Sequence, residues 1–226
     1  MAYTSIDNPE LHFQTVLYSG NSTARDITLD GDKDMQPDWV WIKERDDTIN
    51  HYLTDSVRGA PKKLTSNTSS PESAGDSSWI NAFNSDGFSV GNEDNINDTG
   101  DNYVAWCWKA GTSFSNDASA TSVGTIDSSG KVDTPGAVSI VSWTGTGSAG
   151  TIKHGLSTTP KMIWVKRRDA DDTWWTYNET IGNGAYLALN SNAAKNTSGA
   201  SGLWNSTSPT SSVFSVGTNT GVNGSG

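Results

Sequence analysis

The sequence has little cysteine, histidine or charge, and it contains no long hydrophobic run. Cys107 is the single cysteine among 226 residues, which excludes an internal disulfide framework and a cysteine-rich zinc site. No apolar stretch approaches the roughly 20 residues that span a bilayer, so we expect no membrane insertion. Residues 1–7 have neither the basic nor the apolar segment of a secretory signal, which predicts synthesis in a cytoplasm.

Polar uncharged residues and aromatic residues are abundant instead. Hydrophobic residues make up 33% of the chain and charged residues 18%, while serine, threonine, asparagine and glycine dominate the rest. Ten tryptophans, six tyrosines and five phenylalanines supply the apolar area that a disordered chain would lack. Short apolar runs alternate with Gly, Ser, Asn and Asp loops, and helical periodicity is lacking. This pattern predicts a folded, loop-rich, all-β protein.

The net charge of −10 is unevenly distributed. All of the excess negative charge lies within residues 1–109, whereas residues 110–226 are balanced. The densest basic cluster is only Lys166–Arg168. An acidic surface repels phosphate backbones, so we expect no nucleic-acid partner.

The chain contains an internal repeat. The segment Pro37–Asp46 returns as Pro160–Asp169, and Phe88–Gly91 returns as Phe214–Gly217. Further corresponding pairs are Tyr18 and Trp143, Gly20 and Gly145, Tyr52 and Tyr177, and Trp79 and Trp204. We therefore predict two tandem duplicated β-sandwich domains of the jelly-roll or lectin-like kind.

The repeat sets the expected domain boundaries. Residues 1–109 form the first sandwich repeat and residues 136–226 the second. Residues 110–135 read as a Ser/Thr/Gly-rich connector, with one possible outlying strand at Val123–Ile126.

The second repeat lacks the last strand of the first. After Gly91 the first copy continues into Tyr103–Trp108, an aromatic run that we predict to be a buried closing strand, and the second copy reaches Gly226 without a counterpart. Either the natural polypeptide continues past Gly226 or another chain supplies the strand. We expect continuation, because an open apolar sheet edge promotes aggregation.

Tryptophan is the residue type that bears most on function. Trp41, Trp79, Trp164 and Trp204 recur in both copies, which predicts core packing. Trp175 differs, because its counterpart in the first copy is the polar Asn50. We therefore expect Trp175 to be exposed and to be a candidate contact for a glycan or a partner protein.

One acidic segment has the spacing of a calcium loop. Its carboxylates at loop positions 1, 3, 5 and 9 are Asp30, Asp32, Asp34 and Asp38. Met35 replaces the usual glycine and Trp41 the usual bidentate glutamate, so a solvated Asp/Gly turn is the simpler interpretation. Calcium is the only cofactor with any support in the sequence.

Candidate catalytic groups are not arranged for chemistry. The three histidines, His12, His51 and His154, have unrelated surroundings, and no pair has metal-ligand spacing. The paired carboxylates that glycosidases place on one strand are also missing from the sequence pattern. We expect no enzymatic activity.

The repeated motifs resemble a known tandem domain. The segments that carry the likeness are Tyr18–Asn21, Pro37–Lys43, Asp55–Gly59, Asp86–Gly91, Tyr103–Lys109, Ile140–Gly145, Lys153–Leu156 and Pro160–Lys166. They resemble a tandem lectin-like β-sandwich domain of tail-fibre-like virion structural proteins in marine bacteriophages of the cyanophage type. The likeness covers nearly the whole chain.

This resemblance implies a virion structural protein, expected in the tail rather than on the capsid. A tail fibre or fibre-like appendage is the leading interpretation, with N-terminal domains attached to the particle and a role in host adsorption. The resemblance also implies other virion proteins as partners and a homo-oligomer, with a trimer expected from fibre architecture. Two alternatives remain open: a lectin-like module that binds host surface polysaccharide, and a capsid decoration or head-fibre protein.

Overall fold

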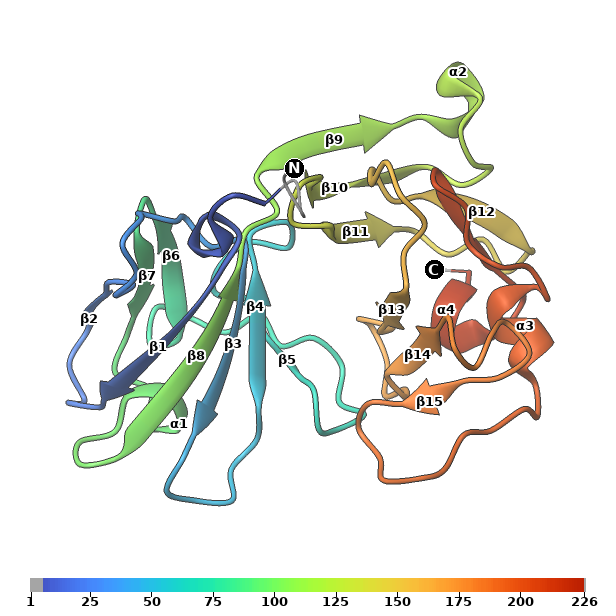
Figure 1. Cartoon of the computed structure of the whole chain (residues 1–226). Coiled ribbons are helices and arrows are strands. Elements are labelled where there is room, and N and C mark those ends of the chain that lie inside the picture. The colour runs from blue at the N-terminus through green and yellow to red at the C-terminus, as the bar shows by residue number, and fades with distance from the viewer. Residues whose placement is uncertain (1–5, 226) are drawn as a thin grey trace. The chain divides into compact units, whose positions relative to one another are not determined.

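The structure is a computed structural model that describes residues 6–225. The chain divides into two compact units. Unit 1 comprises the chain up to Ser66 together with Glu72–Thr112, and unit 2 comprises Asn67–Pro71 together with the chain from Ser113 onward. Antiparallel sheets account for most of the regular structure in both units (Figure 1), so the protein belongs to the all-β class, as predicted.

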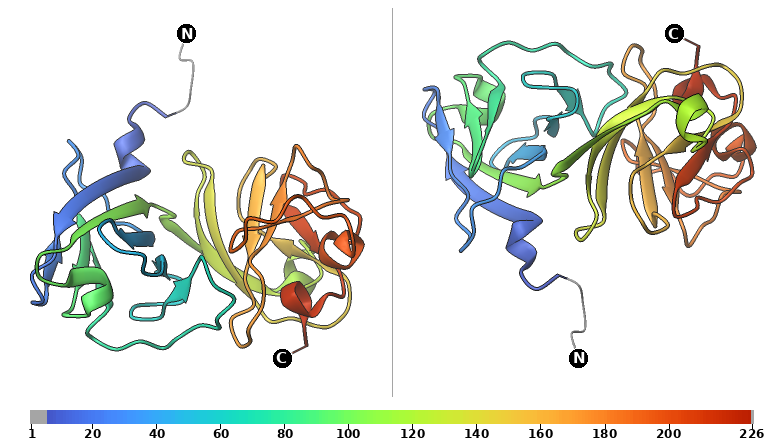
Figure 2. Two further views of the ribbon diagram at one scale, coloured as in Figure 1. Left: turned by 90° about the horizontal axis from the view of Figure 1, so that it is seen from below. Right: turned by 90° about the horizontal axis from the view of Figure 1, so that it is seen from above.

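Unit 1 contains two antiparallel sheets. The strands are β1 (Phe13–Ser19), β2 (Arg25–Ile27), β3 (Trp39–Glu44), β4 (Tyr52–Asp55), β5 (Leu64–Thr65), β6 (Ile80–Asn84), β7 (Gly87–Val90) and β8 (Asn102–Trp108). The larger sheet has five strands in the order β1-β8-β3-β4-β5, and the smaller has three in the order β2-β7-β6. The blue β1 and the green β8 lie side by side in both views of Figure 2.

Strand β8 is an interior strand of the larger sheet, because it pairs with β1 on one side and β3 on the other. Its inward residues Tyr103, Ala105 and Cys107 are fully buried. They join a core to which both sheets contribute, including Val40 from the larger sheet and Phe88 from the smaller. The aromatic run predicted to be a buried strand is therefore an interior strand of the sheet, paired on both sides.

Strand β3 alternates between two faces, and both faces are apolar. Val40 and Ile42 are fully buried in the core, whereas Trp39 and Trp41 lie half-buried on the opposite face. The prediction that Trp41 packs in the core was wrong. Periodicity shows that residues of a strand share a face, but it does not decide which apolar face is the interior one.

Unit 2 contains three small antiparallel sheets. Their strands are β10 (Ser128–Asp133), β11 (Val138–Trp143), β12 (Gly150–Lys153), β13 (Met162–Val165), β14 (Trp175–Asn178), β15 (Leu187–Ala188) and β16 (Val213–Val216). They pair as β10-β11, as β12-β16 and as β13-β14-β15. The core is formed by Ile152, Tyr177, Trp204, Phe214 and other buried residues. Trp204 is 2% exposed, which confirms its predicted core position.

The segment expected to be a connector contains regular structure. Residues 110–135 include β9 (Thr112–Asn116), the helix α2 (Ala118–Thr121) and β10, most of which belongs to unit 2. The possible strand at Val123–Ile126 is reduced to one bridge, from Ile126 to Ile152. Gly124 has φ +75°, which interrupts an extended conformation there.

Helices are short in both units. They are the 3₁₀ helix η1 (Pro9–Leu11) and the α-helices α1 (Asp94–Asn97), α2, α3 (Ala200–Trp204) and α4 (Thr220–Asn223). Within residues 6–225, none is long and apolar enough to cross a membrane.

Candidate functional site: an aromatic sheet face

The outer face of the five-stranded sheet of unit 1 is covered with aromatic side chains. We call this surface the aromatic face and define it by Phe13, Trp39, Trp41, Trp106 and Trp108. Strand register explains why these residues meet. Phe13 is the cross-strand neighbour of Trp108, which is also the neighbour of Trp39, and Trp106 is the neighbour of Trp41.

The rings form a continuous layer. The ring centroids of Trp39 and Trp108 are 4.6 Å apart with an interplanar angle of 27°, and those of Phe13 and Trp108 are 4.9 Å apart. Trp41 and Trp106 follow at 5.6 Å in a tilted arrangement. Such contacts stabilise aromatic pairs beyond simple burial and hold the rings in fixed orientations. The face is therefore a rigid surface whose rings need no ordering when a ligand binds.

Exposure on this face increases towards β1. Leu53 on β4 is 3% exposed, the tryptophans are half-buried, Phe13 is 38% exposed and Leu17 is 60% exposed. Large apolar residues this exposed in one place are typical of interaction surfaces. The accessible part of the aromatic face is its β1 side.

A shallow hollow borders this side of the face. It has a volume of about 220 Å³, and its lining includes Phe13, Thr15, Glu10 and Asp30. Asp30 and Thr15 are exposed. The hollow thus places the Asp30 carboxylate, the Thr15 hydroxyl and the Glu10 carboxylate beside an aromatic ring, and Glu10 Oε2 already accepts from the N–H of Asp32 at 2.8 Å. This combination can stack on a ligand ring while its unoccupied oxygens accept hydrogen bonds.

The floor of the hollow is held by Gln14. This side chain is 5% exposed, and its Nε2 donates to the carbonyls of Glu10 at 2.9 Å and Lys33 at 2.7 Å. Its Oε1 accepts from the backbone N–H of Gly31 at 3.1 Å. A side-chain Cβ at Gly31 would lie 2.6 Å from that oxygen, so the close approach favours glycine. Gln14 fixes the Asp30 loop beside β1.

The four aspartates with calcium-loop spacing do not converge on a common site. Asp30, Asp32 and Asp34 are exposed, whereas Asp38 is 3% exposed and faces the interior. Asp38 accepts hydrogen bonds from the Ser56 hydroxyl and from the N–H groups of residues 110 and 111, so its oxygens are already occupied. No group of three or more metal-ligating side chains occurs among residues 6–225.

Trp175 is half-buried in unit 2 rather than exposed. It packs against the unit 2 core, and its ring contacts Tyr186 edge to face at a centroid distance of 5.0 Å. Its Nε1 donates to Asp172 Oδ1 at 3.0 Å. The indole is therefore engaged within unit 2, which limits the contact with a glycan or a partner that its sequence position suggested. The neighbouring Trp174, in contrast, is 6% exposed.

Unit 2 has a larger hollow of about 310 Å³ between β9, β10 and β11. Its lining is mostly hydroxyls, together with Asp117, Asp127 and Trp143. Asp127 accepts from the N–H of Ala118, and Asp117 caps α2 by accepting from the N–H of Ala120. Trp143 Nε1 donates to the carbonyl of Val222. These polar groups have structural partners, so this hollow is a weaker candidate than the aromatic face.

The buried titratable groups serve structure. His154 is 3% exposed, its Nδ1 accepts from the N–H of Leu156 at 3.1 Å, and its Nε2 lies 3.1 Å from the carbonyl of Thr210. This geometry requires the neutral ring with its proton on Nε2, and burial lowers the pKa of His154. Cys107 is fully buried in β8, and burial raises the pKa of its thiol well above the ordinary range.

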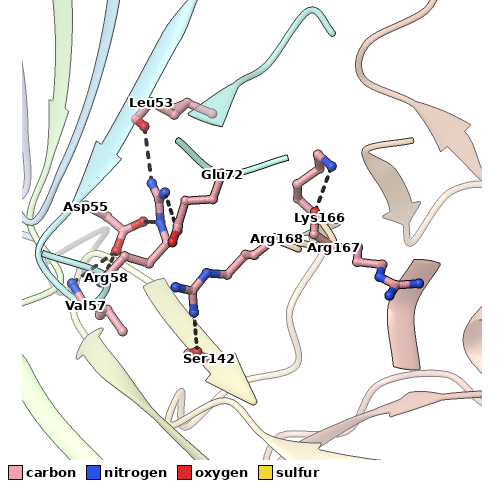
Figure 3. Close-up of polar contacts among 9 residues, drawn as sticks. All are labelled: Leu53, Asp55, Val57, Arg58, Glu72, Ser142, Lys166, Arg167 and Arg168. Atoms are coloured by element: carbon pink, nitrogen blue, oxygen red, sulfur yellow. Dashed lines mark hydrogen bonds and ion pairs between the residues drawn. The ribbon is translucent and has the colours of Figure 1, made fainter. Parts of the chain in front are cut away.

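An ion-pair cluster fastens the turn that follows β4. Arg58 donates to Asp55 through Nε, to Glu72 Oε2 at 3.1 Å and to the carbonyl of Leu53 at 3.2 Å (Figure 3). Asp55 also accepts from the N–H of Arg58 at 2.9 Å. All three charged side chains are at most 13% exposed. The cluster satisfies its own charges, so we assign it a role in stability.

The aromatic face could have been found in the sequence by one signal. Phe13, Thr15 and Leu17 are alternate residues of one strand and so point to the same face of it. Trp106 and Trp108 are likewise alternate residues of a second strand. Pairing these two strands brings both sets to one face, but the sequence does not supply the register. The hollow depends on a loop contact 17 residues away along the chain, from Gly31 to Gln14, for which no sequence signal exists.

The fold and this surface together describe an all-β protein whose first unit carries an aromatic sheet face. The chain belongs to the family described as Domain of unknown function (DUF7483), whose profile matches residues 8–226. No curated protein and no solved structure matches the chain.

Proposed function

We propose that this chain is a non-enzymatic structural protein of a bacteriophage virion that binds host surface polysaccharide through the aromatic face. The observation that carries the binding role is the rigid aromatic face with a carboxylate-lined hollow at its accessible edge. The placement in a tail fibre or fibre-like appendage rests on the motif resemblance. In that setting the partners are other virion proteins, and many copies of a weak site gain affinity through avidity.

The chemistry of the face suits sugar rings. The C–H faces of a pyranose are apolar and stack on aromatic rings, while its hydroxyls need hydrogen-bond acceptors and donors at the rim. Phe13 and Trp108 supply the stacking surface, and Asp30, Glu10 and Thr15 supply the rim. A protein partner would also use an aromatic patch, but it would not require carboxylates placed beside the ring.

We further propose that the two units are duplicated lectin-like β-sandwiches. A buried asparagine supports this, because Asn97 and Asn223 are at most 1% exposed and each closes a short helix. Asn97 Nδ2 donates to the carbonyls of Thr23 and Gly91, and its Oδ1 accepts from the N–H of Asn21. Asn223 makes the same three bonds, with Ser148, Gly217 and Thr146. These partners correspond one to one in the sequence repeat.

The turn after the repeated tryptophan strand also recurs. Lys43 Nζ donates to the carbonyls of residues 44 and 47 in unit 1, and Lys166 Nζ donates to those of residues 167 and 170 in unit 2. A lysine that caps a turn in this way is a specific local device. Its recurrence supports a duplication of structure as well as of sequence.

Binding is tested with the full chain on an array of bacterial lipopolysaccharides and capsular polysaccharides. We expect the parent chain to bind at least one polysaccharide and Phe13→Ala to weaken that binding at least tenfold, because the exposed ring is lost. Met162→Ala is the matched control, since it removes an exposed apolar side chain of unit 2, 51% exposed and outside the face.

Two results would count against this function. Equal binding by Phe13→Ala and Met162→Ala would remove the aromatic face from the proposal, and a parent chain that binds no polysaccharide would end the glycan-binding role. Virion placement is tested separately by electron microscopy of particles labelled near the N-terminus. Label at the tail is expected, whereas label over the capsid would make the protein a decoration or head-fibre protein.

A further inference from the structure

Among the residues that the structure describes, unit 2 has counterparts of β1 and β3 but no strand paired between them. The sequence repeat relates β11 to β1 and β13 to β3. In unit 1 the strand β8 fills the space between that pair. Within the described part of unit 2, β11 pairs only with β10, and β13 is the edge strand of its own sheet.

The core of unit 2 is open along this gap. Val16 and Val40 in unit 1 are 5% and 0% exposed, while their counterparts Val141 and Ile163 are only half-buried. Every residue of β11 is half-exposed, in contrast to the alternating burial of β1. The extra exposure falls on the residues that β8 covers in unit 1.

The two sides of the gap lie within reach of one long side chain. Arg168, in the turn after β13, places Nη1 3.5 Å from Ser142 Oγ on β11 (Figure 3). Two strands separated by one intervening strand are roughly 9.5 Å apart. An arginine side chain can reach from a turn at the end of one strand across that width. The contact therefore places the two sides of the gap within the reach of one arginine side chain, a span that one intervening strand would also fill.

We propose that the gap between β11 and β13 is a docking slot for one extended polypeptide strand that pairs antiparallel with both. The occupant has the residue pattern of Asn102–Trp108, with Tyr and small apolar side chains facing the core and bulky aromatic side chains facing outward. Strand addition of this kind gains affinity from main-chain hydrogen bonds and specificity from alternate side chains. This inference goes beyond polysaccharide binding, and it concerns a different unit.

The template for the occupant is β8 itself. Its inward residues Tyr103, Ala105 and Cys107 fit between Val16 on one side and Val40 on the other, with pairs set by the strand register. A strand of the same pattern in unit 2 would cover Val141 and Ile163. The burial of these half-exposed side chains would favour binding.

The test adds a peptide of residues 101–109, carrying Cys107→Ser and a lysine tail for solubility, to the full chain. Hydrogen exchange is measured by mass spectrometry. We expect exchange in β11 and β13 to slow at least tenfold, with β1 and β3 unchanged because β8 already pairs with them. The matched control is the same peptide with Ala105→Pro, which lacks the central N–H and cannot enter a central strand.

A second measurement keeps the proposal testable if the peptide aggregates. Residues 101–109 are appended after Gly226, and the melting temperature of unit 2 is compared with that of the Ala105→Pro form of the same extension. A higher melting temperature for the first form supports the slot. Equal melting temperatures, or equal exchange with the two peptides, would overturn it. Slow exchange in β11 and β13 without peptide, in a chain that light scattering shows to be dimeric, would assign the slot to a second copy and also overturn it.

Discussion

At the scale of single residues, the buried His154 makes the stability of unit 2 depend on pH. Its Nδ1 already accepts a hydrogen bond from Leu156, so a second proton on the ring would face a donor in place of an acceptor. Burial is the main reason that the pKa of His154 lies below the ordinary value of 6.5. The folded chain therefore binds this proton more weakly than the unfolded chain.

This difference predicts an acid-sensitive unit 2. The contribution of neutral His154 to the free energy of unfolding is fully present above pH 6.5 and is lost as the pH falls below 6.5, where the unfolded chain takes up the proton. In His154→Asn the amide oxygen can still accept from Leu156 but does not titrate. We expect this variant to be less stable at pH 8 and to lose less stability between pH 7 and pH 5, as measured by urea unfolding at each pH. Parallel curves for parent and variant would contradict the prediction.

At the scale of elements, the ion-pair cluster after β4 is predicted to hold the turn between β4 and β5. Removing the guanidinium in Arg58→Met leaves two nearly buried carboxylates, Asp55 and Glu72, without a cation. Breaking one side of a buried ion pair costs about 3–5 kcal/mol of stability. We expect a loss of this size for unit 1 in chemical denaturation.

The chain contains a matched control for this prediction. Lys161 and Glu179 also form an ion pair, but their side chains are 71% and 53% exposed. Exposed pairs contribute at most about 1 kcal/mol because water and salt screen them. Lys161→Met should therefore be nearly neutral. Similar losses for Arg58→Met and Lys161→Met would show that burial does not decide the strength of these pairs.

Strand positions were largely predictable where apolar residues form runs. β1, β7, β11 and β16 each coincide with a run of alternating or continuous apolar residues, the pattern that predicts a strand. β10 was missed because it is polar, and its pairing depends on tertiary contacts. A Cβ at Gly130 would lie 2.1 Å from the carbonyl oxygen of Ile140, so close packing of the two strands favours glycine. No local preference reveals such a constraint.

Functional residues were harder to predict than strands. The spacing of Asp30 to Asp38 resembles a calcium loop, yet Asp38 points inward and fixes the backbone that follows β8. Spacing along a loop does not show which carboxylates face the solvent. Trp175 appeared exposed because its counterpart is polar, but Asp172 accepts its N–H and so allows the indole to be half-buried. For Asp38 the deciding hydrogen-bond partners lie more than 70 residues away along the chain, and for Trp175 the partner lies three residues away.

At the scale of the whole molecule, the two units have separate cores, each with its own buried asparagine anchor. Asn97→Asp and Asn223→Asp replace the donor Nδ2 with an acceptor that faces two carbonyls. Each substitution should cost its own unit about 2–3 kcal/mol, since buried polar groups lose their partners. Cys107 provides a reporter for unit 1, because the thiol is buried in β8 and reacts only when that unit opens.

Labelling of Cys107 by a thiol reagent, measured under native conditions, therefore distinguishes the units. Asn97→Asp should accelerate labelling by roughly 30-fold or more, because each 1.4 kcal/mol changes the open population tenfold. Asn223→Asp should leave the labelling rate unchanged while circular dichroism shows an earlier melting transition. Equal acceleration by both variants would mean that the units open together, and the duplication would then have produced one cooperative structure rather than two.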